Sequence, residues 1–248
     1  MADRYEASGY WGPRKESLGH CAARLSAFLT RLSACAEELS QWYETGWSTQ
    51  DALRRPVTIR DRSRLVDMIK RGANRRDTDG GVIPELGFDV ALWNGRDGGH
   101  AAGLSISSGL FTRRSGIVNS VVLELPEGLI GAGMAHRARE ILSCLVRCWE
   151  PDWAEIHSTE ASRVCPFDAH IPLVDWMVFV SRKVRQVRAI PPPSSLVRID
   201  DLGCLIVVQD EPVRTGSSAD MANVRRVQRA LGITEWKAAP PAAGWHGG

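Results

Sequence analysis

The clearest pattern in this sequence is an apolar stripe at helical spacing near the start of the chain. From Leu18 to Tyr43 the apolar residues recur every three or four positions, and the charged residues fall largely between them. Ser17 stands just before the stripe, and serine is a preferred helix N-cap. The pattern predicts one long amphipathic helix over residues 18–43, preceded by a strand over Tyr5–Tyr10.

Further helices are predicted by the same kind of signal. A second long apolar stripe runs from Met134 to Trp149, and Pro151 ends it. Shorter helices are indicated by capping residues and by helix breakers. One starts at Ser48-Thr49 and stops before Pro56, one starts at Asp61 and ends at Gly72, and one covers Met221–Leu231.

Between the helices the apolar positions alternate, which is typical of strands. Gly-rich turns separate these segments, and Asn94-Gly95 fits a tight hairpin turn. Asp200 to Gly203 is a second hairpin signature, flanked by apolar runs. The predicted strands cover Leu86–Trp93, Ala102–Leu110, Ser120–Leu125, Trp153–Ser158, Trp176–Val180, Val197–Ile199 and Cys204–Val208.

The order of these elements indicates the fold class. Several neighbouring strands are too close in sequence for a helical crossover, so they are expected to pair antiparallel. We therefore expect an α+β fold, in which a largely antiparallel sheet packs against the two long amphipathic helices and the shorter helices. The chain has 248 residues, enough for one large core. Residues 1–237 are predicted to form a single domain, followed by a flexible Pro/Ala/Gly tail over 238–248.

Composition and charge exclude several classes of protein. The chain is 44% apolar and 24% charged, which is ordinary for a globular protein, and its 31 bases nearly balance its 29 acids. No apolar stretch approaches the roughly 20 residues of a membrane span, so no membrane partner is expected. The acidic N-terminus is not typical of a secretory signal. The six cysteines are therefore predicted to be reduced thiols of a cytoplasmic protein.

Two glycine and cysteine motifs are weak as binding sites. The Gly128–Gly133 segment lacks the Lys-Ser/Thr ending of a phosphate-binding loop, so a plain strand-to-helix connection is the preferred interpretation. Cys144 and Cys148 lie one helical turn apart, with His136 and Glu140 on the turns before them. Since no second pair of ligands is visible, these cysteines are interpreted as core thiols rather than zinc ligands.

Two motifs of catalytic type are equally weak. Cys165 could act as a nucleophile only with a histidine base nearby in space, for which His157 and His170 are the sequence candidates. Glu235-Trp236-Lys237 resembles the ending of a metal-dependent nuclease site but lacks an upstream aspartate in a matching context. We therefore predict no catalytic residues, no metal site and no cofactor.

One segment carries an uneven charge, since bases greatly outnumber acids between Arg54 and Arg76. Such a patch can contact nucleic-acid phosphates or an acidic protein surface. No aromatic side chain is interleaved to stack on bases, and a solvated helix face is the preferred interpretation. Nucleic-acid binding by segment 54–76 is kept as the alternative function. The bases are Arg54, Arg55, Arg60, Arg62, Arg64, Lys70, Arg71, Arg75 and Arg76, and the acids are Asp61 and Asp67.

The nine tryptophans fall into two groups by position. Those on apolar faces are expected in the core. Those near loops or element ends either cover the core or anchor an interface, and covering is the commoner role. The first group is Trp42, Trp149 and Trp176, and the second is Trp11, Trp47, Trp93 and Trp153.

A series of short stretches follows a recognisable order from Tyr10 to Leu231. They are Tyr10–Ser17, Arg55–Val57, Arg71–Asp77, Leu86–Phe88, Leu92–Gly95, Gly103–Ile106, Trp149–Trp153 and Asp175–Met177. In this order they resemble the immunity protein 52 family of bacterial polymorphic toxin systems. The resemblance implies an α+β antidote without enzymatic activity, and it supplies no catalytic residues.

The resemblance also implies a protein partner. Members of the family are encoded beside a toxin, often one with a restriction-endonuclease-like nuclease domain, which the antidote binds and blocks in the cytoplasm. A nuclease site holds carboxylates in a basic groove, so a blocker can present either bases or acids to it. The oligomeric state is left open. The expected contacts are the loop Arg75, Arg76 and Asp77, or the acidic residues Asp200, Asp201, Asp210 and Glu211.

Overall fold

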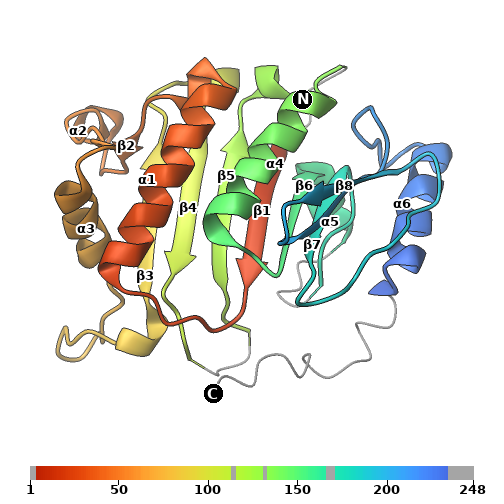
Figure 1. Ribbon diagram of the computed structural model, residues 1–248. Coiled ribbons are helices and arrows are strands. Elements are labelled where there is room, and N and C mark those ends of the chain that lie inside the picture. The colour runs from red at the N-terminus through yellow and green to blue at the C-terminus, as the bar shows by residue number, and fades with distance from the viewer. Residues whose placement is uncertain (1–3, 113–115, 131–132, 166–170, 234–248) are drawn as a thin grey trace.

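One antiparallel sheet of nine strands organises the fold (Figure 1), in the order β2-β3-β4-β5-β1-β6-β7-β9-β8. The structure is a computed structural model that describes residues 4–112, 116–130, 133–165 and 171–233. β1 (Tyr5–Trp11) lies at the centre, between β5 (Asn119–Leu125) and β6 (Trp153–Ser158), and pairs antiparallel with both. The other strands are β2 (Tyr43–Glu44), β3 (Phe88–Trp93), β4 (Gly103–Ser108), β7 (Met177–Ser181), β8 (Ser195–Ile199) and β9 (Gly203–Val207).

Two long helices cover one face of the sheet, side by side (Figure 1). They are α1 (Leu18–Cys35) and α4 (Ala135–Trp149), and α3 (Arg62–Arg71) lies beside α1. The predicted caps are confirmed, because Ser17 Oγ accepts from the His20 N–H and Asp61 Oδ1 from the Arg64 N–H. The α+β class is therefore confirmed, with a sheet that is antiparallel throughout.

The core lies between these helices and the sheet. Trp149 of α4 stacks on Trp11 of β1 with ring centroids 5.8 Å apart, and Phe28 of α1 meets Trp149 edge-on. A second apolar cluster occupies the opposite face of β7 and β9, where α6 (Ser218–Ala230) packs through Val224 and Val227. The short helices are α2 (Thr49–Ala52) and α5 (Thr159–Val164), with single 3-10 turns at Glu37–Leu39, Pro84–Leu86, Gly98–His100 and Glu127–Leu129.

The prediction of one helix over residues 18–43 is wrong in its second half. The helix ends at Cys35, because Ala36 takes an extended conformation with φ −159° and ψ 144°. Trp42 then folds into the core, 1% exposed, and its indole N–H donates to the Leu39 carbonyl. Tyr43 enters β2 opposite Trp93. Leu39 and Trp42 are buried by tertiary packing at positions that happen to continue the helical spacing, which explains the wrong prediction.

The predicted Asn94-Gly95 two-residue turn is also wrong, although β3 and β4 do form a hairpin. Their connection runs over residues 94–102, and the buried Asn94 side chain bonds across it. Asn94 Oδ1 accepts from the N–H groups of Arg96 and Ala102, while Nδ2 donates to the carbonyls of Glu38 and His100. Asparagine thus serves here as a bridge inside a longer loop. The predicted tail over 238–248 lies outside the described residues.

Candidate functional site

A basic edge forms where α2, α3 and the edge strand β2 meet. Between the segment Arg54–Thr58 and α3 lies a groove of about 710 Å³. Its apolar lining comes from Pro56, Val57, Leu65 and Met68. Charged side chains from both elements and from β2 surround that lining, and they are Glu44, Arg54, Arg55, Arg64, Asp67 and Arg71.

Several arginines of this edge are held in place by carboxylates. One Arg71 guanidinium nitrogen lies 2.7 Å from both carboxylate oxygens of Glu44. Arg55 pairs with Asp51 at 2.7 Å. Exposed pairs of this kind contribute only about 0–1 kcal/mol to stability, but they restrict where the guanidinium groups can point. The basic edge therefore carries both positive and negative groups and is not uniformly positive.

The loop that follows α3 carries Arg75, Arg76 and Asp77, all of them exposed. It is a closed turn, since the Arg76 N–H donates to the Gly81 carbonyl and the Gly80 N–H donates to the Arg76 carbonyl, both at 2.9 Å. Arg75 Nη1 donates to the Gly80 carbonyl at 3.1 Å. The structure therefore places this predicted contact loop directly after the basic edge.

The predicted acidic contacts lie elsewhere. Asp200, at the β8–β9 turn with φ 48°, accepts from Arg147 of α4 at 2.9 Å, and this bond lowers its pKa. Asp201 accepts from Arg182 at 3.0 Å. Asp210 and Glu211 follow the opposite end of β9 and are exposed.

The arginine loop and the acidic turn do not form one site. The loop borders β3, which is second in the sheet order, and the turn joins β9 and β8 at the far edge. Six steps of about 4.8 Å separate β3 from β9, or roughly 29 Å. Each set therefore marks its own candidate surface.

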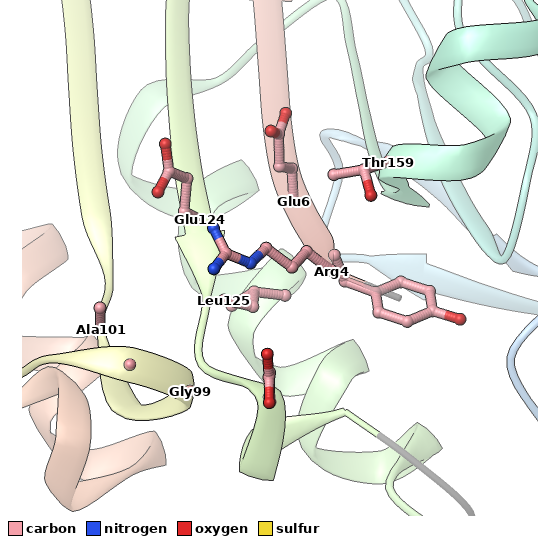
Figure 2. A pocket seen from close by; sticks show the side chains of 10 residues that line it. Arg4, Glu6, Gly99, Ala101, Glu124, Leu125 and Thr159 are labelled. Atoms are coloured by element: carbon pink, nitrogen blue, oxygen red, sulfur yellow. The ribbon is translucent and has the colours of Figure 1, made fainter. Parts of the chain in front are cut away.

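A small pocket lies at one end of β1 and β5 (Figure 2). Arg4 reaches across it toward Glu124, and Glu6 and Glu127 lie around it. Burial and the nearby Glu124 raise the pKa of Glu6. The cavity holds about 150 Å³, below the roughly 300–1,000 Å³ of typical small-molecule sites. It is too small for an organic substrate of ordinary size.

Two ionisable side chains are buried side by side on β6. Burial raises the pKa of Glu155 to about 8, and its carboxylate accepts from the Leu173 N–H at 2.7 Å. Burial lowers the pKa of His157 to about 4. The carboxyl neighbours of His157 are Glu6 at 3.6 Å and Glu155 at 3.9 Å. His157 is thus a buried histidine among carboxylates, and no contact with Cys165 places it as a base for that thiol within the described part of the chain.

The cysteines lie in the helix layer and at element ends. Cys21 and Cys148 are buried, and burial raises the pKa of both thiols. Cys35 and Cys144 are half-buried and face each other. Among the described residues no group of three or more His, Cys, Asp or Glu side chains is arranged to hold a metal ion. His170 and the Glu235-Trp236-Lys237 motif lie outside the described residues, as does part of the Gly128–Gly133 loop.

The described tryptophans differ widely in burial. Trp42, Trp149 and Trp176 are core residues as predicted, Trp11 belongs to the same core cluster at 2% exposed, and Trp153 is 4% exposed. Trp47, in contrast, is 99% exposed in the loop before α2. Sequence reasoning named it only as one of several loop tryptophans. The signal that distinguishes it is its neighbourhood of polar and small residues, Thr45-Gly46 and Ser48-Thr49.

These observations define the structural class of the protein. It is an α+β protein built on one nine-stranded antiparallel sheet, with a basic edge beside β2. The family model described as immunity protein 52 matches residues 3–235. The chain belongs to the immunity protein 52 family, and its role is that of an immunity protein in toxin systems.

Comparison with solved structures adds a likeness of fold. The chain is similar to the Pseudomonas aeruginosa T6SS protein PA0821, with a TM-score of 0.54 and 13% sequence identity. The likeness covers 93% of this chain and 73% of that chain. Comparison with curated protein sequences finds no match. None of the described helices has both the length and the apolar character needed to cross a bilayer.

Proposed function

We propose that this chain binds a cognate bacterial toxin and neutralises it by covering its working surface. The observation that carries the proposal is the family match, which spans residues 3–235 and hence nearly the whole chain. Neutralisation of this kind needs a stable scaffold and a complementary surface, and it makes or breaks no covalent bond. Tight inhibitors of proteins typically cover about 800 Å² on each partner, with aromatic and arginine anchors.

The toxin is proposed to be a nuclease with a restriction-endonuclease-like domain, met in the cytoplasm, where nucleic acid is within its reach. The resemblance in fold to a T6SS protein supports delivery by type VI secretion between competing bacteria. A nuclease centre combines metal-binding carboxylates with a basic groove. The chain offers groups for either feature, at two separate surfaces.

Of these surfaces, the loop of Arg75, Arg76 and Asp77 is the favoured contact. It is exposed, held in a closed turn and continuous with the basic edge. Asp200 and Asp201 lie at the far edge of the sheet and pair with Arg147 and Arg182 at 2.9 and 3.0 Å, closer than the 3.4 Å between Arg76 and Asp79. The second candidate contact consists of Asp200, Asp201, Asp210 and Glu211.

Co-expression tests the proposal. The adjacent toxin domain is here the C-terminal domain of the toxin that, by the family resemblance, is encoded beside this chain. Cells that express it alone should stop growing, and cells that also express this chain should grow. The purified pair should co-elute on size exclusion. Continued arrest together with separate elution would refute the proposal.

Nucleic-acid binding by segment 54–76 is the second candidate, favoured by the bases of the basic edge. Its affinity should fall steeply as salt rises. The carboxylates of Glu44, Asp51 and Asp61 neutralise part of that edge, which weakens this alternative. A lack of binding to both DNA and RNA oligonucleotides at low salt would exclude it.

A further inference from the structure

We propose that Trp47 and the groove beside α3 form the docking surface for the toxin, and that this surface receives an apolar side chain flanked by carboxylates. This inference rests on the proposed function. It replaces no contact named above, because the Arg75–Asp77 loop lies at the end of the same edge. It adds an aromatic anchor and a pocket.

Hydrogen bonds order the backbone that carries Trp47. Its ring is 99% exposed, although an indole is the largest apolar group that a protein can bury. The backbone N–H of Trp47 donates to Asp51 Oδ2, and the backbone N–H of Asp51 donates to Ser48 Oγ. Asp51 also holds Arg55. Because the backbone under Trp47 is already ordered, burying the ring in a partner costs little additional loop entropy.

A second exposed apolar side chain lies at the other end of α2. Leu53, immediately after α2, is 45% exposed. Trp47 and Leu53 flank α2, and the next residues of the chain, Arg54–Thr58, form one wall of the groove. The chain thus brings an exposed aromatic ring, an exposed aliphatic side chain and the groove wall together within one short segment.

The groove itself selects for an acidic protein surface. Its lining is apolar, through Val57, Leu65 and Met68, and guanidinium groups stand at its rim. Arg54 makes no ion pair with any residue in the described part of the chain, so its charge is available to a partner. Arginine and tryptophan around an apolar depression are the residues that dominate interface energetics.

Two other occupants fit less well. A second copy of this chain, docked face to face, would set arginine against arginine. A nucleic-acid backbone, which carries a charge at every phosphate, gains nothing from the apolar lining of Val57, Leu65 and Met68. An acidic protein surface with a protruding apolar group satisfies both the rim and the lining.

The test compares matched variants against the adjacent toxin domain by isothermal titration calorimetry. Trp47→Ala should weaken binding by about 30-fold or more, as expected for an interface anchor. Arg54→Glu should weaken it by about tenfold or more, whereas Arg198→Glu, the same charge change on the far strand β8, should leave it unchanged. Trp47→Phe should restore part of the affinity. Thermal melting should be the same for all four variants.

Each other outcome overturns a stated part of the account. If the unmodified chain binds and Trp47→Ala and Arg54→Glu bind equally well, this docking surface is wrong while the proposed function stands. If the unmodified chain does not bind the toxin domain, the proposed function fails, and the docking surface with it. If a double-stranded DNA oligonucleotide binds the chain and Arg54→Glu abolishes that binding, the edge belongs to nucleic acid and the inference is wrong.

Discussion

Cys35 on α1 and Cys144 on α4 face each other across the helix layer, with their sulfur atoms 3.6 Å apart. The two thiols share one hydrogen bond, which lowers the pKa of Cys144, and the nearby Arg31 and Arg147 lower it further. The same bond raises the pKa of Cys35. The two long helices are therefore joined by a thiol–thiol contact in which Cys144 has the lower pKa of the pair.

Alkylation rates test this asymmetry. Because the thiolate is the reacting form, Cys144 should be modified by iodoacetamide before Cys21 and Cys148, whose pKa values burial raises. Peptide mass spectrometry after short exposure at neutral pH would identify the site. If Cys21 or Cys148 reacts first in the native protein, the assignment is wrong.

A buried and an exposed tryptophan, Trp149 and Trp47, make a matched pair for stability. Trp149 is 1% exposed and stacks on Trp11, so Trp149→Ala should lower the free energy of unfolding by about 3–5 kcal/mol. Trp47 is 99% exposed, so Trp47→Ala should change it by less than about 0.5 kcal/mol. Urea denaturation monitored by circular dichroism measures both. A large loss of stability for Trp47→Ala would mean that its ring is packed.

Gly72 marks a close approach between α3 and β3. A Cβ on Gly72 would lie 1.8 Å from the Asp89 carbonyl oxygen, a backbone atom that cannot rotate away. Gly72→Ala should therefore destabilise the fold by about 1–3 kcal/mol or more. Gly128, where a Cβ would meet nothing within 4 Å, supplies the control. Equal melting temperatures for Gly72→Ala and Gly128→Ala would contradict the described junction.

Glu155 and His157 make stability depend on pH in opposite senses. The folded state keeps the Glu155 proton up to a pKa of about 8, whereas the ordinary value is 4.5, so rising pH favours the unfolded state within that range. The folded pKa of His157 is about 4 against an ordinary 6.5, so its contribution to stability is lost as pH falls through that range. Of these two groups, Glu155 is the one that changes the free energy of unfolding between pH 6.5 and 8.

The expected result is a free energy of unfolding that falls by about 1–2 kcal/mol from pH 6.5 to pH 8, since one pH unit corresponds to about 1.4 kcal/mol. Glu155→Gln keeps an oxygen for the Leu173 N–H and carries no titrating proton. Urea titrations of this variant across the same range should show a flat profile. A fall as steep as that of the unmodified protein would show that Glu155 is not its source.

Local rules were enough to predict most of the fold. The predicted strand segments are confirmed as β1 and β3 to β9, and Ser17 and Asp61 cap helices as expected, because capping and alternation depend on near neighbours. The failures lie where distant segments decide. Trp42 falls at a helical spacing although it lies outside the helix, because tertiary packing fixes its burial. Asn94 was expected in a two-residue turn, but its side chain instead donates to the carbonyls of Glu38 and His100 in a longer loop.

The candidate site was less accessible to sequence reasoning. The charge excess over 54–76 is visible in the sequence, but its partial neutralisation by Glu44 and Asp51, which lie outside that segment, is not. Arg147 and Asp200 are 53 positions apart in sequence, so their pairing is equally hidden. The exposure of Trp47 depends on how the loop leaves β2, which no periodicity specifies.

The central claim is that this chain acts by occupying a toxin's surface, and a titration of toxin activity tests it most directly. A fixed amount of the adjacent toxin domain is assayed on its nucleic-acid substrate while increasing amounts of this chain are added. Inhibition should be immediate and should be complete near equimolar amounts. Toxin activity that persists at a large excess of this chain would contradict the account. So would a slow loss of toxin activity with far less than one equivalent of this chain, because it would indicate catalytic inactivation.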